Sequence, residues 1–226
     1  MLFYKLTACL YAHLAMIEGI VNLIFGSLIL INIMEELLSF LNQIASGEGW
    51  PLSAGCLNYL RKTIKVRTLK EEEFLLTAGQ VCGNLYFIRK GLLKCFYLVH
   101  QKEVSDWFFG ELEVVVSIDS FYDQIPSEDF IQALTHCELF YITYEELNYL
   151  YRAFIEFNVV GRVLTNKYLR IWHQQARNIR MLSAEERYLF LLKTQPDLIN
   201  RVSVKDLASY LDMTRETLSR MRGRIY

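Results

Sequence analysis

The 226-residue chain, 53% hydrophobic and 22% charged, has room for one large domain or two modest ones, and this composition excludes a disordered protein. Its net charge is −1, but residues 1–160 hold 11 Lys and Arg against 19 Asp and Glu, whereas residues 161–226 hold 13 against 6. Such a basic C-terminal third is typical of a protein that binds a phosphate backbone through that end.

The cysteines and histidines indicate neither a disulfide framework nor a metal centre. The five cysteines show no CxxC spacing and their number is odd, which favours free thiols in a reducing compartment. The four histidines show no ligand spacing. We therefore expect no metal, no iron–sulfur cluster and no other cofactor. The sequence contains neither a nucleophile elbow nor a P-loop, so we assign no catalytic residue and do not expect an enzyme.

Residues 6–33 are strongly apolar and allow two interpretations. The stretch from Leu14 to Ile31 could span a bilayer, and its one charge is at Glu18. It lacks the small-residue cleavage site of a signal peptide. We favour an extension or a misassigned start over residues 1–33, with a membrane anchor as the alternative, because the features that follow are those of a cytoplasmic protein.

After residue 33, apolar residues recur first at helical spacing and then in short segments typical of strands. Residues 34–70 are predicted to be helical, because apolar residues recur at helical spacing, as at Leu37, Leu38, Leu41 and Ile44. From Phe74 the chain changes to short segments rich in β-branched and aromatic residues, separated by glycine and polar turns. Several short strands at close spacing favour a β-roll or barrel.

The stretch GQVCGNLYFIRKG, from Gly79 to Gly91, is similar to the first signature of the cyclic-nucleotide-binding fold. Turn glycines stand at both ends, and the apolar strand Leu85–Ile88 lies between them. Glycine adopts the left-handed backbone conformation at little cost. These glycines therefore indicate the fold and not a ligand.

The same resemblance implies a ligand site further along. The family has a G-E-L turn, whose glutamate holds the ribose, and an R-S pair that clamps the cyclic phosphate. Gly110, Glu111 and Leu112 match the turn and Ser127 matches the serine, but Pro126 replaces the arginine. A phosphate needs a charge-assisted donor, and proline has none. We therefore expect a pocket poorly suited to cyclic AMP or cyclic GMP; the alternative is that Glu111 is only a turn residue and Ser127 a strand cap.

Residues 147–181 are predicted to form one long helix. Apolar residues recur in it every seven positions, at Leu150, Phe157, Leu164 and Ile171. A sustained seven-residue repeat indicates a helix paired along its length. We expect these residues to form the seam of a homodimer; the alternative is that they pack on the β-roll of their own chain.

Residues 203–224 are predicted to form two short helices joined by a tight turn. Ser203 and Thr214 are suitable N-caps, and Leu218 and Met221 give the second helix an apolar side. At about 100° per residue the other side of that helix carries Arg215, Glu216, Ser219 and Arg220. Arginine can hold a guanine edge and glutamate can accept from a cytosine, which indicates a major-groove reader. The alternative is an ordinary helical hairpin with a charged solvent face.

The run TRETLSR resembles the recognition helix of the Crp/Fnr superfamily of bacterial transcription regulators, which has the pattern R-E-T-x-x-R. Arg215, Glu216, Thr217 and Arg220 match that pattern. The resemblance implies that Arg215, Glu216 and Arg220 contact bases and that Thr214 or Thr217 lies near phosphate. It also implies a sensor domain over residues 34–146, a dimerisation helix over 147–181 and a helix-turn-helix domain over 182–226, whose wing is truncated at Tyr226.

Together these features predict an α+β protein with an N-terminal β-roll resembling a cyclic-nucleotide-binding jelly roll, a long dimerisation helix and a C-terminal helix-turn-helix. The predicted function is a cytoplasmic transcription regulator, not responsive to cyclic AMP, that binds a palindromic operator as a homodimer. Its implied partners are double-stranded DNA, a second copy and RNA polymerase; the small-molecule effector is not identified. The alternative is a cyclic-nucleotide-fold module, membrane-attached or not, that acts through protein contacts and carries a degenerate DNA motif.

Overall fold

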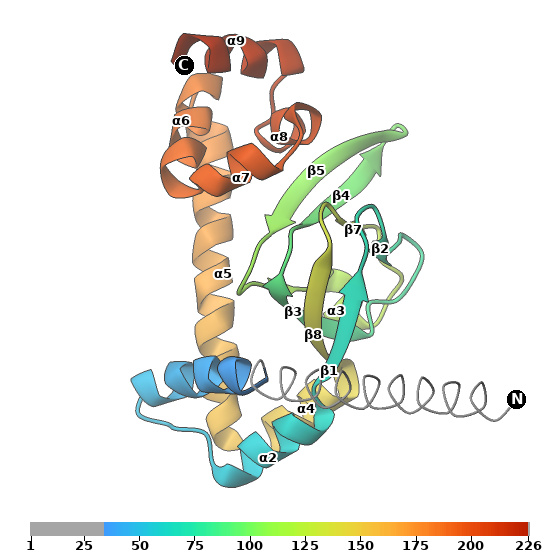
Figure 1. Ribbon diagram of the computed structural model, residues 1–226, viewed down its shortest axis with the longest axis vertical. Coiled ribbons are helices and arrows are strands. Elements are labelled where there is room, and N and C mark those ends of the chain that lie inside the picture. The colour runs from blue at the N-terminus through green and yellow to red at the C-terminus, as the bar shows by residue number, and fades with distance from the viewer. Residues whose placement is uncertain (1–33, 226) are drawn as a thin grey trace, which may run out of the picture. The chain divides into compact units, whose positions relative to one another are not determined.

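A computed structural model describes residues 34–225 (Figure 1). The extension or anchor expected over residues 1–33 lies outside the described residues. Within residues 34–225, no helix combines the length and the apolar character needed to cross a bilayer. The chain divides into two compact units, which are described separately. One holds the described residues up to Lys62 together with Glu156–Val160, and the other holds Thr63–Ile155 and the residues from Gly161 onward.

The first unit is built from helices. Residues 34–47 are helical, and α2, Ala54–Thr63, follows after a short loop. Three residues of the predicted apolar stripe are buried, while Ile44 is only partly buried; two residues near the start of the long helix α5 (Ile155–Met181) are buried as well. These buried side chains are Leu37, Leu38, Leu41, Phe157 and Val160. The unit therefore has an apolar core of its own, as helical spacing predicts.

The prediction that the helical segment continues to residue 70 is wrong. Helix α2 ends at Thr63, and Lys65–Leu69 form strand β1. The β-branched side chains of Val66 and Thr68 suit a pleated strand. Strand β1 pairs with a strand far along the chain, which a local periodicity cannot indicate.

The second unit contains a β-roll of two antiparallel sheets. One sheet has the strand order β1-β8-β3-β6 and the other β2-β7-β4-β5. The further strands are β2 (Phe74–Leu76), β3 (Asn84–Lys90), β4 (Leu93–Val99), β5 (Lys102–Phe109), β6 (Val114–Val115), β7 (Phe130–Ala133) and β8 (Cys137–Thr143), with the short helix α3 (Ile118–Asp123) after β6. The predicted α+β class with a β-roll is confirmed.

Both signature glycines have the left-handed conformation that the sequence predicts. The φ angle is 89° at Gly79 and 111° at Gly91. A Cβ on Gly91 would lie 2.5 Å from the sulfur of Cys137 and 2.7 Å from the carbonyl oxygen of His136. The turn between β3 and β4 therefore has no room for a larger residue.

The prediction of one continuous helix over residues 147–181 needs correction. Helix α4 spans Tyr144–Ala153, and α5 begins at Ile155 after the extended residue Phe154. The apolar pattern runs on across this break, so periodicity does not reveal it. Leu150 consequently belongs to α4, where it is fully buried, and not to the long helix.

Four helices complete the second unit (Figure 1). They are α6 (Ala184–Thr194), α7 (Pro196–Arg201), α8 (Val204–Tyr210) and α9 (Arg215–Ile225). Ser183 and Glu186 form a capping box at the start of α6. Pro196 follows the end of α6 and occupies the first turn of α7, where its missing N–H and fixed φ suit a helix start.

The C-terminal helices share one apolar core with the β-roll. Tyr188, Leu207 and Leu218, from three different helices, are completely buried in it. Leu92 and Phe108 of the β-roll belong to the same cluster. Apolar burial therefore ties α6, α8 and α9 to each other and to the β4–β5 hairpin.

Candidate nucleic-acid interface and ligand pocket

Helices α8 and α9 form the predicted helix–turn–helix unit. The Ser203 hydroxyl accepts the Asp206 N–H at 3.1 Å, and the Thr214 hydroxyl accepts the Thr217 N–H at 3.2 Å. Both predicted N-caps are therefore confirmed. Asp212, in the turn between the helices, has a left-handed φ of 51°, which aspartate tolerates better than most residues.

The two sides of α9 differ as the helical projection predicts. Leu218 and Met221 are buried in the shared core. The side chains that face solvent are Arg215, Glu216, Ser219 and Arg220. Hydrogen bonds from its own backbone N–H and from Thr214 lower the pKa of Glu216, as is expected at a helix N-terminus. The exposed face thus offers arginine donors beside an ionised carboxylate.

The two threonines at the start of α9 hold the turn together. The hydroxyls of Thr214 and Thr217 lie 3.1 Å apart, and the Thr214 hydroxyl also caps the helix. Thr217 is partly buried and Thr214 is exposed. Both lie at the N-terminal end of α9, where backbone N–H groups favour an anion.

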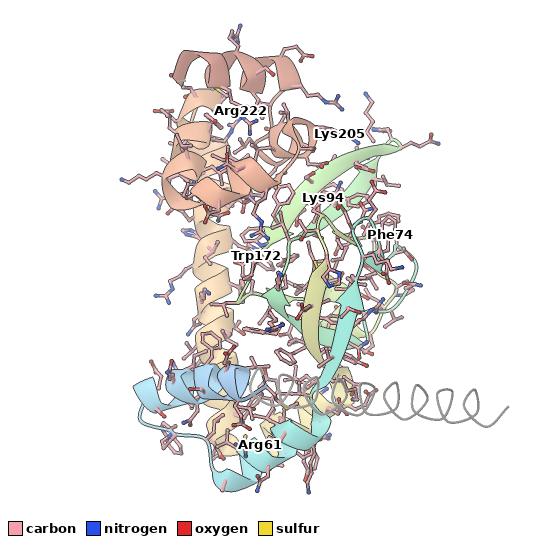
Figure 2. All side chains as sticks on the ribbon, viewed as in Figure 1. Arg61, Phe74, Lys94, Trp172, Lys205 and Arg222 are labelled. Atoms are coloured by element: carbon pink, nitrogen blue, oxygen red, sulfur yellow. The ribbon has the colours of Figure 1, made fainter. Side chains whose placement is uncertain are left out.

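Helix α8 packs against the β4–β5 hairpin, and the contact includes a buried cation (Figure 2). The Lys94 ammonium donates to Asp206 at 3.1 Å and to Glu103 at 3.2 Å, and its side chain is only 5% exposed. Lys205 of α8 also bonds to Glu103. A buried ammonium is tolerated only when carboxylates compensate its charge. Sequence reasoning missed this contact, although a lysine inside the apolar strand LLKCFYLV is a signal for it.

Glu111 has a partner within the protein. Its carboxylate accepts two bonds from the Arg201 guanidinium of α7, at 2.8 and 2.9 Å, and one from the Gly91 N–H at 3.0 Å. The bonds from Arg201 are the main reason why the pKa of Glu111 is lowered to about 2. The glutamate predicted to hold a ribose thus binds an arginine of the C-terminal helices.

The other residues of the predicted ligand site also have contacts within the protein. Ser127 is buried, and its hydroxyl lies 2.9 Å from that of Ser117 and accepts the Asp129 N–H. Leu112 is exposed, and the Gly110 N–H donates to Glu113. The Ser127 backbone is hydrogen-bonded to Gly79 and Gln80 in the loop before β3.

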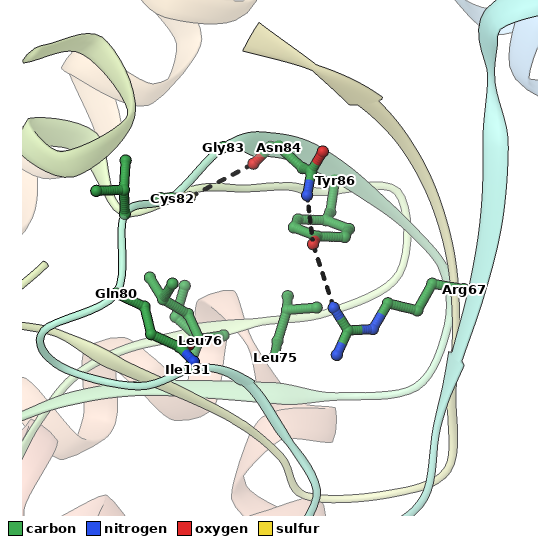
Figure 3. A pocket seen from close by; sticks show the side chains of 10 residues that line it. Arg67, Leu75, Leu76, Gln80, Cys82, Gly83, Asn84, Tyr86 and Ile131 are labelled. Carbon is green, nitrogen blue, oxygen red and sulfur yellow. Dashed lines mark hydrogen bonds between the residues drawn. The ribbon is translucent and has the colours of Figure 1, made fainter. Parts of the chain in front are cut away.

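A cavity of about 410 Å³ lies in the β-roll instead (Figure 3). It is lined by Arg67, Leu75, Leu76, Gln80, Val81, Cys82, Gly83, Asn84, Tyr86 and Ile131. None of the four predicted pocket residues is among them. Sequence reasoning missed this cavity because Arg67 lies in the segment predicted as helix. It in fact belongs to strand β1, and its guanidinium reaches Tyr86 of β3.

The predicted dimer seam is also partly wrong. Leu150 and Phe157 are buried in their own chain, so they are not available to a second copy. Leu164 and Ile171 are half-buried, and Ile171 lines a cavity of about 350 Å³ together with Trp107 and Tyr210. Leu169, Trp172 and Ile179 of α5 are more exposed, although Ile179 also lines this cavity and the Trp172 ring packs edge-on against Trp107.

Residues 66–154 match the family model described as "Cyclic nucleotide-binding domain". This segment runs from β1 through α4 and so contains the whole β-roll. This segment is therefore similar to that family, in the place where the glycine signature predicts it. The sequence matches none of the curated proteins.

Several solved structures share the fold over most of the chain. FixK2 of Bradyrhizobium japonicum is 16% identical with a TM-score of 0.63, and the match covers 72% of this chain and 84% of FixK2. The c-di-GMP responsive global regulator CLP of Xanthomonas campestris is 22% identical, with a TM-score of 0.58 and coverage of 76% and 91%. A protein of Eubacterium rectale assigned to the Crp/Fnr family of transcriptional regulators is 16% identical, with a TM-score of 0.60 and coverage of 75% and 82%.

At these identities the likeness concerns the fold. A β-roll, a long helix and a C-terminal group of short helices follow one another as in these regulators. The chain has a segment similar to the cyclic nucleotide-binding domain, and it shares the fold of Crp/Fnr-type regulators. The resemblance first indicated by the TRETLSR run is confirmed at this level.

Proposed function

We propose that the chain is a transcription regulator that binds a palindromic operator in double-stranded DNA as a homodimer. The observation that carries this proposal is the exposed polar face of α9. Arg215, Glu216 and Arg220 project from a capped helix whose other side is anchored by Leu218 and Met221. A helix that enters the major groove needs this combination of a fixed inner side and free hydrogen-bonding groups on the outer side.

The chemistry of the face supports base reading. Arg215 and Arg220 can each bind a guanine edge with two hydrogen bonds, and Glu216 can accept from a cytosine amino group. Thr214 or Thr217, at the N-terminal end of the helix, would contact a phosphate. The net positive charge of residues 161–226 would add attraction to the DNA backbone that is independent of sequence.

The exposed stripe on α5 supports self-association. Leu169 is 62% exposed, and Trp172 and Ile179 follow on the same face at intervals of three and seven residues. An apolar stripe at this spacing suits a paired helix. Two copies joined in this way would present two α9 helices, which can address successive major-groove turns when they lie about 34 Å apart.

Cyclic AMP and cyclic GMP are not expected to be the effectors. Pro126 offers no donor where the family has an arginine, and the Glu111 carboxylate is already paired with Arg201. Lys94, another candidate donor, is held by Asp206 and Glu103. A cyclic phosphate would therefore lack its charge-assisted hydrogen bonds.

A binding-site selection from random duplex DNA with the full chain tests the proposal. We expect enrichment of a palindrome. Replacing Arg215 by Ala should then cost about 1–3 kcal/mol in binding to the selected site at fixed salt. Arg152→Ala is the matched control, because it removes the same charge from an exposed position on α4 and should leave binding within about 0.5 kcal/mol of the parent.

If the selection enriches no DNA sequence, the proposal of sequence-specific DNA binding is contradicted, and a module that acts through protein contacts is favoured. Equal binding by the Arg215→Ala variant and the parent would remove this arginine from the interface, even if a palindrome is enriched.

Sedimentation tests the homodimer separately. Leu169→Glu should shift the full chain from dimer to monomer, because the carboxylate would be buried without a partner at the seam. Leu98→Glu on β4 is the control, because Leu98 is also exposed, at 50%, but lies outside α5. An unchanged dimer mass for Leu169→Glu would exclude this face of α5 as the seam.

A further inference from the structure

The cavity in the β-roll has walls from both sheets (Figure 3). Arg67 and Tyr86 come from β1 and β3 of one sheet, while Leu76 and Ile131 come from β2 and β7 of the other. The loop before β3 closes one side and includes the exposed residue Gln80, so the cavity is reachable from solvent. Its volume of about 410 Å³ lies within the range of small-molecule pockets.

One part of the wall is apolar. Leu75, Leu76 and Ile131 are all buried and present aliphatic side chains to the cavity. Ile131 is paired with Cys95 of β4, the strand that carries Lys94. These side chains favour a hydrocarbon group over a sugar or a polar base, because the apolar surface of a ligand packed against them is removed from water.

One side of the cavity offers hydrogen-bond donors. The Tyr86 hydroxyl accepts from Asn84 Nδ2 at 3.2 Å and from Arg67 Nη1 at 3.4 Å, and Figure 3 shows both side chains directed at it. Since both neighbours donate, neither receives the hydroxyl proton of Tyr86. That proton and the remaining N–H groups of the guanidinium can therefore donate to a ligand.

The charge at this site has no carboxylate to compensate it. No Asp or Glu lines the cavity. Within residues 34–225, Arg67 forms no salt bridge. Arg89, by contrast, is paired with Glu138, and Lys94 with two carboxylates. A half-buried guanidinium beside a free hydroxyl proton attracts an anion.

From these observations we propose that the β-roll binds a small carboxylic acid with an apolar body in this cavity. Its carboxylate bonds to Arg67 and Tyr86, and its hydrocarbon body lies against Leu75, Leu76 and Ile131. One guanidinium and one hydroxyl match the two oxygens of a single carboxylate, whereas the lining offers no second cation for a dianion. Glu111 does not line this cavity, and Ser127 adjoins it only through its backbone hydrogen bond to Gln80. The proposal does not depend on DNA binding.

Calorimetric titration of the full chain with octanoate tests the proposal. Octanoate should bind, whereas octanol, which has the same chain without the charge, should bind at least about tenfold more weakly, because it lacks charge-assisted bonds. Arg67→Gln should weaken octanoate binding by about ten- to a hundredfold. Arg152→Gln removes an arginine outside the cavity and should leave the affinity unchanged.

A second variant keeps the test decisive if Arg67→Gln does not fold, which circular dichroism would show. Tyr86→Phe keeps the ring and removes the hydroxyl, and should weaken octanoate binding by about two- to tenfold. The proposal is overturned if octanoate does not bind at millimolar concentration, if octanol binds as well as octanoate, or if the folded variants bind like the parent. Binding of cyclic AMP that is lost in Arg67→Gln would also overturn it, since the ligand class would then be a nucleotide.

Discussion

Helices α8 and α9 are neighbours in the chain, but they use their polar side chains in opposite ways. Helix α8 directs Asp206 inward, where it compensates the buried Lys94 of the β-roll. Helix α9 directs Arg215 and Arg220 outward, where no carboxylate of the described chain pairs with them. Their apolar sides enter the same core, at Leu207 and Leu218.

The difference separates residues that hold the fold from residues that are free to bind a partner. A buried charge such as that of Lys94 persists only with compensating carboxylates, so its contacts are set by the protein itself. An exposed charge on the outer face of α9 needs no compensating carboxylate. Substitutions on α8 and its contacts should therefore change unfolding, while those on the outer face of α9 should change binding alone.

The largest effect is expected at Lys94. Lys94→Met should lower the free energy of unfolding in urea by about 3–5 kcal/mol, because it leaves the Asp206 carboxylate buried without its cation. Lys70→Met is the control, since Lys70 is exposed and its loss should cost less than about 0.5 kcal/mol. Adding Asp206→Asn to Lys94→Met should restore part of the loss. Equal stability of Lys94→Met and the parent would show that the contact between α8 and the hairpin is dispensable.

The second prediction concerns the outer face of α9. In a selected operator, Glu216→Ala should remove about 1–3 kcal/mol of discrimination at one cytosine position, while the free energy of unfolding stays within about 0.5 kcal/mol of the parent. Competition binding with single-base operator variants measures the first quantity and urea unfolding the second. A Glu216→Ala variant that keeps its base preference but unfolds more easily would contradict the division between the two helices.

Local signals predict much of this unit from sequence. The N-caps Ser203 and Thr214, the buried Leu218 and the exposed Arg215 all follow from helical geometry and side-chain chemistry over a few residues. The left-handed Gly91 follows in the same way from its place in a turn signature.

Contacts between distant segments were not predictable in this way. Asp206 lies 112 residues from Lys94, and Arg201 lies 90 residues from Glu111, so no local pattern links them. Arg67 was missed for a related reason, because strand β1 gains its hydrogen bonds from β8 near the end of the roll. Sequence reasoning therefore identified the face of α9 but neither the contacts of α8 nor the cavity.

A weaker effect is expected for the ion pair between Glu111 and Arg201, which joins α7 to the β-roll. The folded-state pKa of Glu111 is about 2 against a usual 4.5, so the pair stabilises the folded chain above pH 4.5 and this contribution is lost as the pH falls toward 2. The side chains are 40% and 32% exposed, so we expect less than about 1 kcal/mol after screening by solvent.

Unfolding of the Glu111→Gln variant across this pH range measures the contribution. The difference in stability between parent and variant should be largest above pH 4.5 and should shrink as the pH falls. Glu71→Gln, at an exposed turn position, is the control. A difference that grows on acidification would have the wrong sign for this ion pair.

No loss of stability is expected at Tyr188 of α6, in the core that α8 and α9 share. Tyr188 is completely buried, and its hydroxyl has no hydrogen-bond partner among the described residues. Tyr188→Phe should therefore leave the free energy of unfolding unchanged or raise it by about 1 kcal/mol, because an unsatisfied buried hydroxyl is unfavourable. Tyr210→Phe is the matched control. The Tyr210 hydroxyl donates to Gln175 at 3.3 Å, so its removal should cost about 0.5–1.5 kcal/mol. If Tyr188→Phe lowers the free energy of unfolding as much as Tyr210→Phe does, the Tyr188 hydroxyl has a partner and the core shared by α8 and α9 is not purely apolar. The contrast between the two helices would then rest on their polar contacts alone.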